Sequence, residues 1–156
     1  MSEVLEAIRQ WLTGQQIQYR EVQHAPTRTS EESAAARGEP LHIGGKAILL
    51  KTDDTFRLFV LPADRKLDAG AVRAQLKVKK TRFATAEELL AQTGLVPGCV
   101  PPFGRPIFDL DLYVDESIMQ NDRIAFNAGS LTDSIIMSRD DYVRVAEPTV
   151  FRFANQ

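Results

Sequence analysis

The segment Gly98-Cys99-Val100-Pro101-Pro102-Phe103-Gly104 most constrains the fold, because two adjacent prolines stand between glycines. Proline fixes φ, lacks a backbone N–H and restricts the residue before it, so neither a helix nor a central strand can continue through this segment. Glycine tolerates backbone conformations that other residues avoid and lets a ligand approach the main chain closely. We therefore expect a loop of one fixed shape that can present backbone N–H groups to a carbonyl or phosphate group.

Helical and strand patterns cover most of the remaining chain. Apolar spacing and capping residues predict helices from Val4 to near Gly14, from Thr29 or Ser30 to Ala36, and over 67–76, 86–90 and 140–145, with Asp68 and Thr85 as caps. Period-two patterns and short apolar runs predict strands over 17–22, 47–50, 57–61, 79–84, 107–114, 123–127 and 134–138. The runs 47–50 and 57–61 flank a turn region over 51–55, which predicts a β-hairpin of central strands.

These elements predict one domain over residues 1–156. No repeat, low-complexity tract or linker divides the chain. We expect an α+β (mixed α/β) fold, with a mixed, mostly antiparallel sheet of about six or more strands surrounded by helices. Within it, Asp109 and Asp111 alternate with apolar residues and are expected on the solvent-facing side of an edge strand rather than in a metal cluster.

Composition excludes several classes of protein. The chain has 156 residues and 44% hydrophobic content, but no apolar run of about 18 residues and no signal-peptide pattern, so we expect a cytoplasmic protein that is not in a membrane. The single cysteine, Cys99, cannot form an internal disulfide, and with only His24 and His42 beside it no Cys- or His-rich metal cage can form. We expect neither a metal nor a cofactor.

Charge is concentrated in one part of the chain. The net charge is −2, yet Asp64 to Arg82 carries two acidic residues and seven basic ones, which are Arg65, Lys66, Arg73, Lys77, Lys79, Lys80 and Arg82. Such a segment is either a solvated surface or a contact for nucleic acid.

A few residues carry candidate chemistry. Lys46 begins an apolar strand, where its ammonium is either exposed to solvent or placed to hold a phosphate or carbonyl; Pro40 and Ala47 exclude a phosphate-binding P-loop. Cys99 is a nucleophile or a small buried hydrophobe, and no neighbouring His or Asp supports the nucleophile. The turn with Asn127, Gly129 and Ser130 either caps backbone groups or binds a ligand.

Four segments together resemble the YbaK and prolyl-tRNA synthetase editing-domain family. They are Lys46 to Lys51, Val60 to Asp68, Gly98 to Gly104, and Phe126 to Ser130. Their order and spacing are much more specific than any one of them, and the resemblance extends from about His24 to Val145.

The resemblance implies a freestanding trans-editing deacylase, which hydrolyses the ester between a wrong amino acid and the 3′ adenosine of a tRNA. Lys46 corresponds to the family's lysine, which helps to fix the terminal adenosine or its phosphate. Gly98, Cys99, Val100, Pro101 and Pro102 correspond to its Gly-x-x-x-Pro loop, whose backbone amides hold the aminoacyl carbonyl. Water or the substrate's own groups then attack, and no protein nucleophile is needed.

The resemblance also implies a substrate pocket and partners. Phe103, Gly104, Asn127, Gly129, Ser130 and Ser134 are expected to line the pocket, and Arg73, Lys77, Lys79 and Lys80 to contact the tRNA. The implied partners are a mischarged tRNA and an aminoacyl-tRNA synthetase.

Three alternatives stay open. Alanine-editing members tend to carry Asn after the lysine and His at the position of Asn127, whereas this chain has Ala47 and Asn127; cysteine-editing relatives have Asp at the position of Ser134. The amino acid that is removed is therefore open. The second alternative is a binding module of the same fold that recognises a tRNA or a synthetase without hydrolysis, and a weaker third is general DNA binding through the basic segment.

Overall fold

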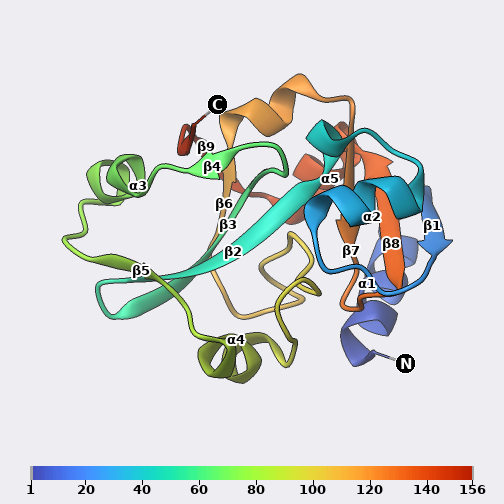
Figure 1. Cartoon of the computed structure of the whole chain (residues 1–156), viewed down its shortest axis with the longest axis horizontal. Coiled ribbons are helices and arrows are strands. Elements are labelled where there is room, and N and C mark those ends of the chain that lie inside the picture. The colour runs from blue at the N-terminus through green and yellow to red at the C-terminus, as the bar shows by residue number, and fades with distance from the viewer. Residues whose placement is uncertain (1, 156) are drawn as a thin grey trace.

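Five strands form the central sheet in the order β5-β2-β3-β6-β9 (Figure 1). Strands β2 (Gly45–Thr52) and β3 (Thr55–Pro62) pair antiparallel from Gly45 opposite Pro62 to Thr52 opposite Thr55. The sheet is mixed, because β5 (Thr81–Phe83) is antiparallel to β2, while β6 (Leu112–Asp115) and β9 (Thr149–Phe151) run parallel to their neighbours. The protein is seen here in a computed structural model that describes residues 2–155.

A second sheet meets the central sheet at the start of β2. It has the order β1-β8-β7, from β1 (Tyr19–Gln23), β8 (Asp133–Ser138) and β7 (Arg123–Asn127), all antiparallel. A parallel bridge between Gly44 and Ala125 joins the two sheets. A Cβ atom on Gly45 would lie 2.7 Å from Ile124 Cδ1, so any larger residue there would force the Ile124 side chain to shift. The close approach of the two sheets brings Lys46 and the end of β7 to the same part of the molecule.

Helices cover the sheets where the sequence predicts them. They are α1 (Glu3–Gly14), α2 (Ser30–Arg37), α3 (Ala69–Leu76), α4 (Ala86–Thr93) and α5 (Arg139–Ala146). The predicted caps Asp68 and Thr85 are confirmed, and Thr29 rather than Ser30 caps α2 by accepting from the Glu32 N–H. Gly38, at φ +70°, ends α2 in the left-handed conformation. No helix in residues 2–155 is both long and apolar enough to span a bilayer.

The Gly-Pro loop is anchored in the main core by an aromatic cluster. The ring of Phe103 is fully buried, and its centroid lies 5.2 Å from Trp11, 5.3 Å from Phe126 and 5.5 Å from Tyr142. Aromatic pairs at these distances add to the stabilisation that comes from burial. The loop is thereby held against α1, β7 and α5.

The mixed α/β class is confirmed, with differences in the arrangement of the strands. The strands divide between two larger sheets and a small pair formed by β4 (Lys66–Leu67) and β10 (Ala154–Asn155), so they do not form one sheet. Strands β4, β9 and β10, and the 3-10 helices η1 (Leu41–Ile43) and η2 (Glu116–Gln120), were not predicted. The hairpin turn contains only Asp53 and Asp54 between paired strands, because the pairing continues beyond the apolar runs.

The strand predicted over 107–114 is confirmed only for residues 112–114, and its first five residues, 107–111, are not a strand. Irregular structure continues to Asp111, and β6 begins at Leu112 inside the central sheet, between β3 and β9. Asp109 and Asp111 therefore do not lie on an edge strand; their carboxylates form ion pairs with Arg105 instead. The buried Asp115 carboxylate accepts hydrogen bonds from the Phe153 and Ala154 N–H groups at 2.7 and 2.8 Å, which fixes the end of the chain against β6.

Candidate active site

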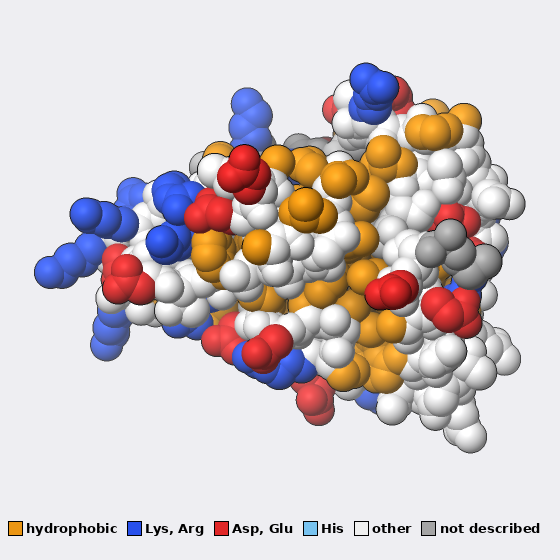
Figure 2. Space-filling model, turned by 90° about the horizontal axis from the view of Figure 1, so that it is seen from below, with side chains coloured by type: hydrophobic (Ala, Val, Ile, Leu, Met, Phe, Trp, Pro, Cys, Tyr) orange, Lys and Arg blue, Asp and Glu red, His pale blue; other side chains and the backbone are white. Residues whose placement is uncertain are grey.

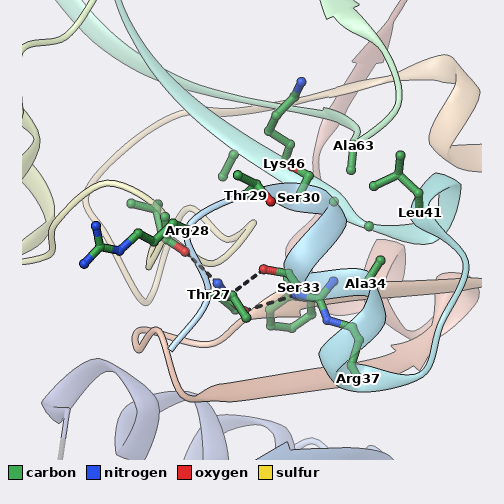
Figure 3. A pocket seen from close by; sticks show the side chains of 17 residues that line it. Thr27, Arg28, Thr29, Ser30, Ser33, Ala34, Arg37, Leu41, Lys46 and Ala63 are labelled. Carbon is green, nitrogen blue, oxygen red and sulfur yellow. Dashed lines mark hydrogen bonds between the residues drawn. The ribbon is translucent and has the colours of Figure 1, made fainter. Parts of the chain in front are cut away.

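A cavity of about 260 Å³ lies between α2, the start of β2, the end of β7 and the Gly-Pro loop (Figure 3). Three cationic residues line it, Arg28, Arg37 and Lys46, and no acidic residue of the described chain does. Its other polar lining includes four hydroxyl side chains, those of Thr27, Thr29, Ser30 and Ser33. This charge distribution favours a ligand that carries negative charge or develops it during a reaction.

Lys46 lies at the second position of β2, where the two sheets meet. Its ammonium donates a hydrogen bond of 2.8 Å to the carbonyl oxygen of Arg65. Figure 3 shows the side chain extending from the strand away from Thr27 and Ser33. Burial lowers the pKa of Lys46 below its usual value, partly offset by the charges of Asp64 and Glu31. Lys46 therefore provides a localised cation at the edge of the cavity.

The Gly-Pro loop contributes backbone through Gly98 and Val100. Pro101 and Pro102 have no N–H, the Cys99 N–H donates to the Val96 carbonyl and the Phe103 N–H to the Pro101 carbonyl. Within residues 2–155 the N–H groups of Gly98 and Val100 make no hydrogen bond. Gly98 and Val100, the two loop residues that line the cavity, therefore each have a backbone N–H group that is free to bind a ligand.

Asn127 connects this loop to α2 and β8. Its Nδ2 donates to the Gly98 carbonyl at 2.8 Å, and its Oδ1 accepts from Arg37 Nη2 and Ser134 Oγ, each at 3.1 Å. Arg37 Nε donates to Ser134 Oγ at 3.2 Å, and His24 Nε2 lies 2.8 Å from the same oxygen. Asn127 lines the cavity, whereas Ser134 is fully buried behind it and orients the side chains that do.

Arg37 is a pocket residue that the sequence did not indicate. Its side chain is inward because Ser33, Ala34 and Arg37 form the buried face of α2: Arg37 follows Ala34 by three residues and Ser33 by four, the spacings that place residues on one side of a helix. An arginine in the last turn of a short helix is usually assigned to solvent, where it interacts with the helix dipole. The spacing to Ser33 and Ala34 was the signal that could have identified it.

The Cys99 side chain has the properties of a small buried hydrophobe. It is buried in the main core and does not line the cavity, and burial raises the pKa of its thiol above the usual value. Its carbonyl accepts a hydrogen bond of 2.9 Å from the Gly129 N–H. Residues 2–155 contain no group of three or more His, Cys, Asp or Glu side chains arranged to hold a metal ion.

Other predicted site residues lie outside this cavity. Pro101, Pro102, Phe103 and Gly104 form the buried part of the loop itself and do not line the cavity. Gly129 and Ser130 line a different hollow beside α1, where Ser130 Oγ donates to the Asp133 carboxylate at 2.8 Å. The structure therefore brings together Lys46, Gly98, Val100 and Asn127, with Ser134 directly behind them.

The predicted tRNA contacts lie at the far end of the central sheet. Arg73, Lys79 and Lys80 line a hollow together with Lys51 and Arg82, and Lys77 is the exposed cap residue of α3. The Asp53 carboxylate accepts from the N–H groups of Lys79 and Lys80 at 3.0 and 2.9 Å, which holds this basic segment against the β2–β3 turn. Figure 2 shows Lys and Arg side chains gathered at this end of the molecule.

Replacing Tyr142 with phenylalanine is expected to loosen the Gly-Pro loop. The fully buried Tyr142 hydroxyl donates to the Pro102 carbonyl at 2.6 Å, and burial raises its pKa so that it remains a neutral donor. Removal leaves that carbonyl unpaired, which we expect to lower the free energy of unfolding by about 1 to 3 kcal/mol. Denaturant unfolding measures this loss, and an unchanged midpoint would contradict the anchoring role.

The match with known proteins agrees with this geometry. The model of the aminoacyl-tRNA editing domain family matches residues 24–145. The chain is 32% identical over 141 residues to the multifunctional Ser/Thr-tRNA deacylase ProXp-y of Escherichia coli K12, covering 86% of this chain and 83% of that protein. It is 33% identical over 101 residues to the proline–tRNA ligase of Shouchella clausii, covering 65% of this chain but only 18% of the ligase.

The fold is also similar to that of solved structures. A crystal structure described as a candidate trans-editing enzyme for prolyl-tRNA synthetase superposes with a TM-score of 0.84, at 22% identity, over 100% of this chain and 99% of the other. At 22% identity the structural similarity supports the fold alone. The family relationship is shown by the family model and by the deacylase relative.

Proposed function

The chain belongs to the aminoacyl-tRNA editing domain family, and from that premise we propose that residues 1–156 act as one editing domain, a deacylase of mischarged tRNA. The reaction is hydrolysis of the ester between the amino acid and the 3′ adenosine. The observation that carries this proposal is the cavity lined by Lys46, Gly98 and Val100, because the backbone N–H groups of Gly98 and Val100 have no hydrogen-bond partner within residues 2–155.

In the proposed mechanism the Gly98 and Val100 N–H groups bind the oxygen of the aminoacyl carbonyl. The oxygen of a water molecule attacks the carbonyl carbon, negative charge develops on the carbonyl oxygen, and the bond from that carbon to the ribose oxygen breaks. The water supplies one proton to the leaving ribose oxygen, and the products are the free amino acid and the tRNA. A donor fixed where negative charge develops typically contributes about 3 to 4 kcal/mol to an acyl-transfer reaction.

Lys46 has a separate role in this mechanism. Its ammonium binds a phosphate or ribose oxygen of the terminal nucleotide. This new hydrogen bond replaces the one that Lys46 donates to the Arg65 carbonyl in the free protein. The buried Cys99 thiol takes no part, and the attacking group comes from water or from the substrate. Binding and orientation by Lys46 and the loop then supply most of the rate enhancement.

We propose serine and threonine as the amino acids removed. The support is the relative from Escherichia coli whose name specifies Ser/Thr-tRNA, together with the hydroxyl-rich lining of a cavity of about 260 Å³. A cavity of this size suits a small side chain. The proposed partners are the mischarged tRNA and the aminoacyl-tRNA synthetase that produces it, in the cytoplasm.

A panel of tRNAs charged with serine, threonine, alanine, cysteine or proline tests the function. Each tRNA is labelled at its terminal adenosine, and loss of the aminoacyl group is followed with the purified protein and with the Escherichia coli relative as positive control. We expect Ser-tRNA and Thr-tRNA to lose the amino acid faster than in buffer alone. If all five remain intact while the positive control is active, the proposed function is wrong.

We further propose that Arg73, Lys77, Lys79 and Lys80, at the far end of the central sheet, hold the tRNA. Because each phosphate contact releases a counterion, replacing Lys79 with alanine is expected to reduce the slope of log K against log salt by about 1 while leaving the rate of the bound complex unchanged. Filter binding of uncharged tRNA over a salt series measures the slope. Arg144→Ala, an exposed charge on α5, serves as control, and equal slopes in wild type and Lys79→Ala would contradict the contact.

A further inference from the structure

Arg37 is a buried cation that lacks an acidic partner in the described chain. Its relative exposure is 7%, and no carboxylate of residues 2–155 forms an ion pair with it. Glu39 is the acidic residue whose charge acts on the pKa of Arg37, but its carboxylate forms ion pairs with Arg20 and Arg123, at 2.7 and 2.8 Å. Burial lowers the pKa of Arg37 to about 10, so the guanidinium is still charged at neutral pH. A buried charge without a counter-charge is costly, and its retention suggests a ligand.

The guanidinium has donor groups left over. Nε and Nη2 donate to Ser134 and Asn127, while Nη1 makes no hydrogen bond within residues 2–155. Nη1 would lie 3.7 Å from a Cβ atom on Gly44, which places it beside the cavity wall formed by Gly44. Figure 3 shows the Arg37 side chain reaching from α2 toward Ser33. The free donor therefore faces the cavity.

The neighbouring hydroxyls complete a polar corner. Thr27 Oγ1 and Ser33 Oγ are buried 2.7 Å apart, so that either can donate to the other. The corner thus offers the fixed donors of Arg37 together with hydroxyls that both donate and accept. A side-chain hydroxyl matches this set, because its oxygen accepts from the guanidinium and its proton is donated to Thr27 or Ser33. A methyl group in the same place would leave the guanidinium donor unpaired.

We infer that Arg37 is the residue that selects a hydroxyl-bearing amino acid, by hydrogen bonding to the side-chain oxygen of serine or threonine on the tRNA. This inference rests on the proposed deacylase function. Arg37 also holds Asn127, which holds the Gly98 carbonyl. Recognition of the side chain is thereby connected to the backbone that binds the ester.

The test compares serine with alanine, which differ by one oxygen atom. For wild type we expect kcat/KM for Ser-tRNA to exceed that for Ala-tRNA by about 10- to 100-fold, the range of one charge-assisted hydrogen bond. Arg37→Met, which is similar in length but has no donor, is expected to bring the Ser-to-Ala ratio of kcat/KM to about 1; the lost hydrogen bond to Asn127 lowers both values as well, so the ratio is the quantity compared. Arg37→Lys, which keeps the charge but not the planar fork, is expected to retain part of the preference.

Arg123→Gln is the matched control, since it removes one positive charge beside Glu39 without lining the cavity. Its Ser-to-Ala ratio is expected to equal that of wild type. The inference is overturned if wild type hydrolyses both substrates equally, a measurement that does not depend on how a variant folds, or if Arg37→Met keeps the wild-type Ser-to-Ala ratio. If wild type hydrolyses no aminoacyl-tRNA at all, the proposed function fails and the inference fails with it.

Discussion

Replacing Lys46 with alanine is expected to lower kcat/KM for deacylation by about 100-fold, because the terminal nucleotide loses the cation that orients the ester and a misplacement of about 1 Å can cost about that factor in rate. Lys46 is the only lysine among the residues that line the described cavity, and no other amine there can replace it. The effect on folding is expected to be small, because the side chain loses one hydrogen bond, to Arg65, worth about 1 kcal/mol. Single-turnover deacylation and denaturant unfolding measure the two quantities separately.

Lys66→Ala is the control for this experiment. Lys66 is exposed and lies close enough for its charge to lower the pKa of Lys46, but it does not line the cavity. Its removal deletes a neighbouring positive charge and is expected to change kcat/KM by less than about threefold. Equal losses in both variants would show that Lys46 acts only through the general positive potential of this region.

Replacing Gly98 with alanine is expected to lower both stability and activity. Gly98 has φ +91°, which L-residues avoid, and a Cβ atom there would lie 3.2 Å from Leu131 Cδ2. We expect a loss of about 1 to 2 kcal/mol in the free energy of unfolding. Any shift of the loop also moves the Val100 N–H and the Gly98 carbonyl that Asn127 holds, and a misplacement of about 1 Å can cost about 100-fold in rate.

Gly94→Ala separates these two effects. Gly94 also has a positive φ, +74°, at the end of α4, but nothing lies within 4 Å of the Cβ position and the residue does not line the cavity. The variant is expected to lose a similar amount of stability and to retain the wild-type rate. If Gly94→Ala and Gly98→Ala lose activity equally, the loss reflects stability alone and the loop has no specific role.

Local sequence predicted much of the fold because its elements have strong local determinants. The β2–β3 hairpin follows from two apolar runs with a turn between them, and all five α-helices of the described chain begin at a capping residue, namely Ser2, Thr29, Asp68, Thr85 and Ser138. The remaining strands depend on distant partners. β10 is positioned by the Asp115 carboxylate, and no pattern within residues 149–155 indicates that contact.

The segment 107–114 shows why an alternating pattern can mislead. Its acidic residues alternate with apolar ones as in an edge strand, but the cause is different. Asp109 and Asp111 bind Arg105, while Phe108 and Leu110 are buried under the Gly-Pro loop. The alternation of acidic and apolar residues therefore comes from the packing of an irregular segment on the core, and not from a strand.

The sequence indicated those residues of the candidate site that lie in the segments shared with the editing-domain family. Lys46, Gly98, Val100 and Asn127 border one cavity, as the family resemblance implies, although their roles stay predictions. Arg37 could not be found in this way, because its inward orientation depends on the packing of α2 against β7 and β8 through Asn127 and Ser134.

Binding of a hydrolysis-resistant substrate analogue tests the central claim that the ester lies between Lys46 and the loop backbone. A 3′-seryl-amino-3′-deoxyadenosine, with an amide in place of the ester, is titrated into ¹⁵N-labelled protein and the backbone amide resonances are followed. The account predicts saturable shifts centred on the amides of Lys46, Gly98 and Val100. Saturable shifts confined to Lys79–Arg82 or Gly129–Ser130, with those three amides unchanged, would contradict it.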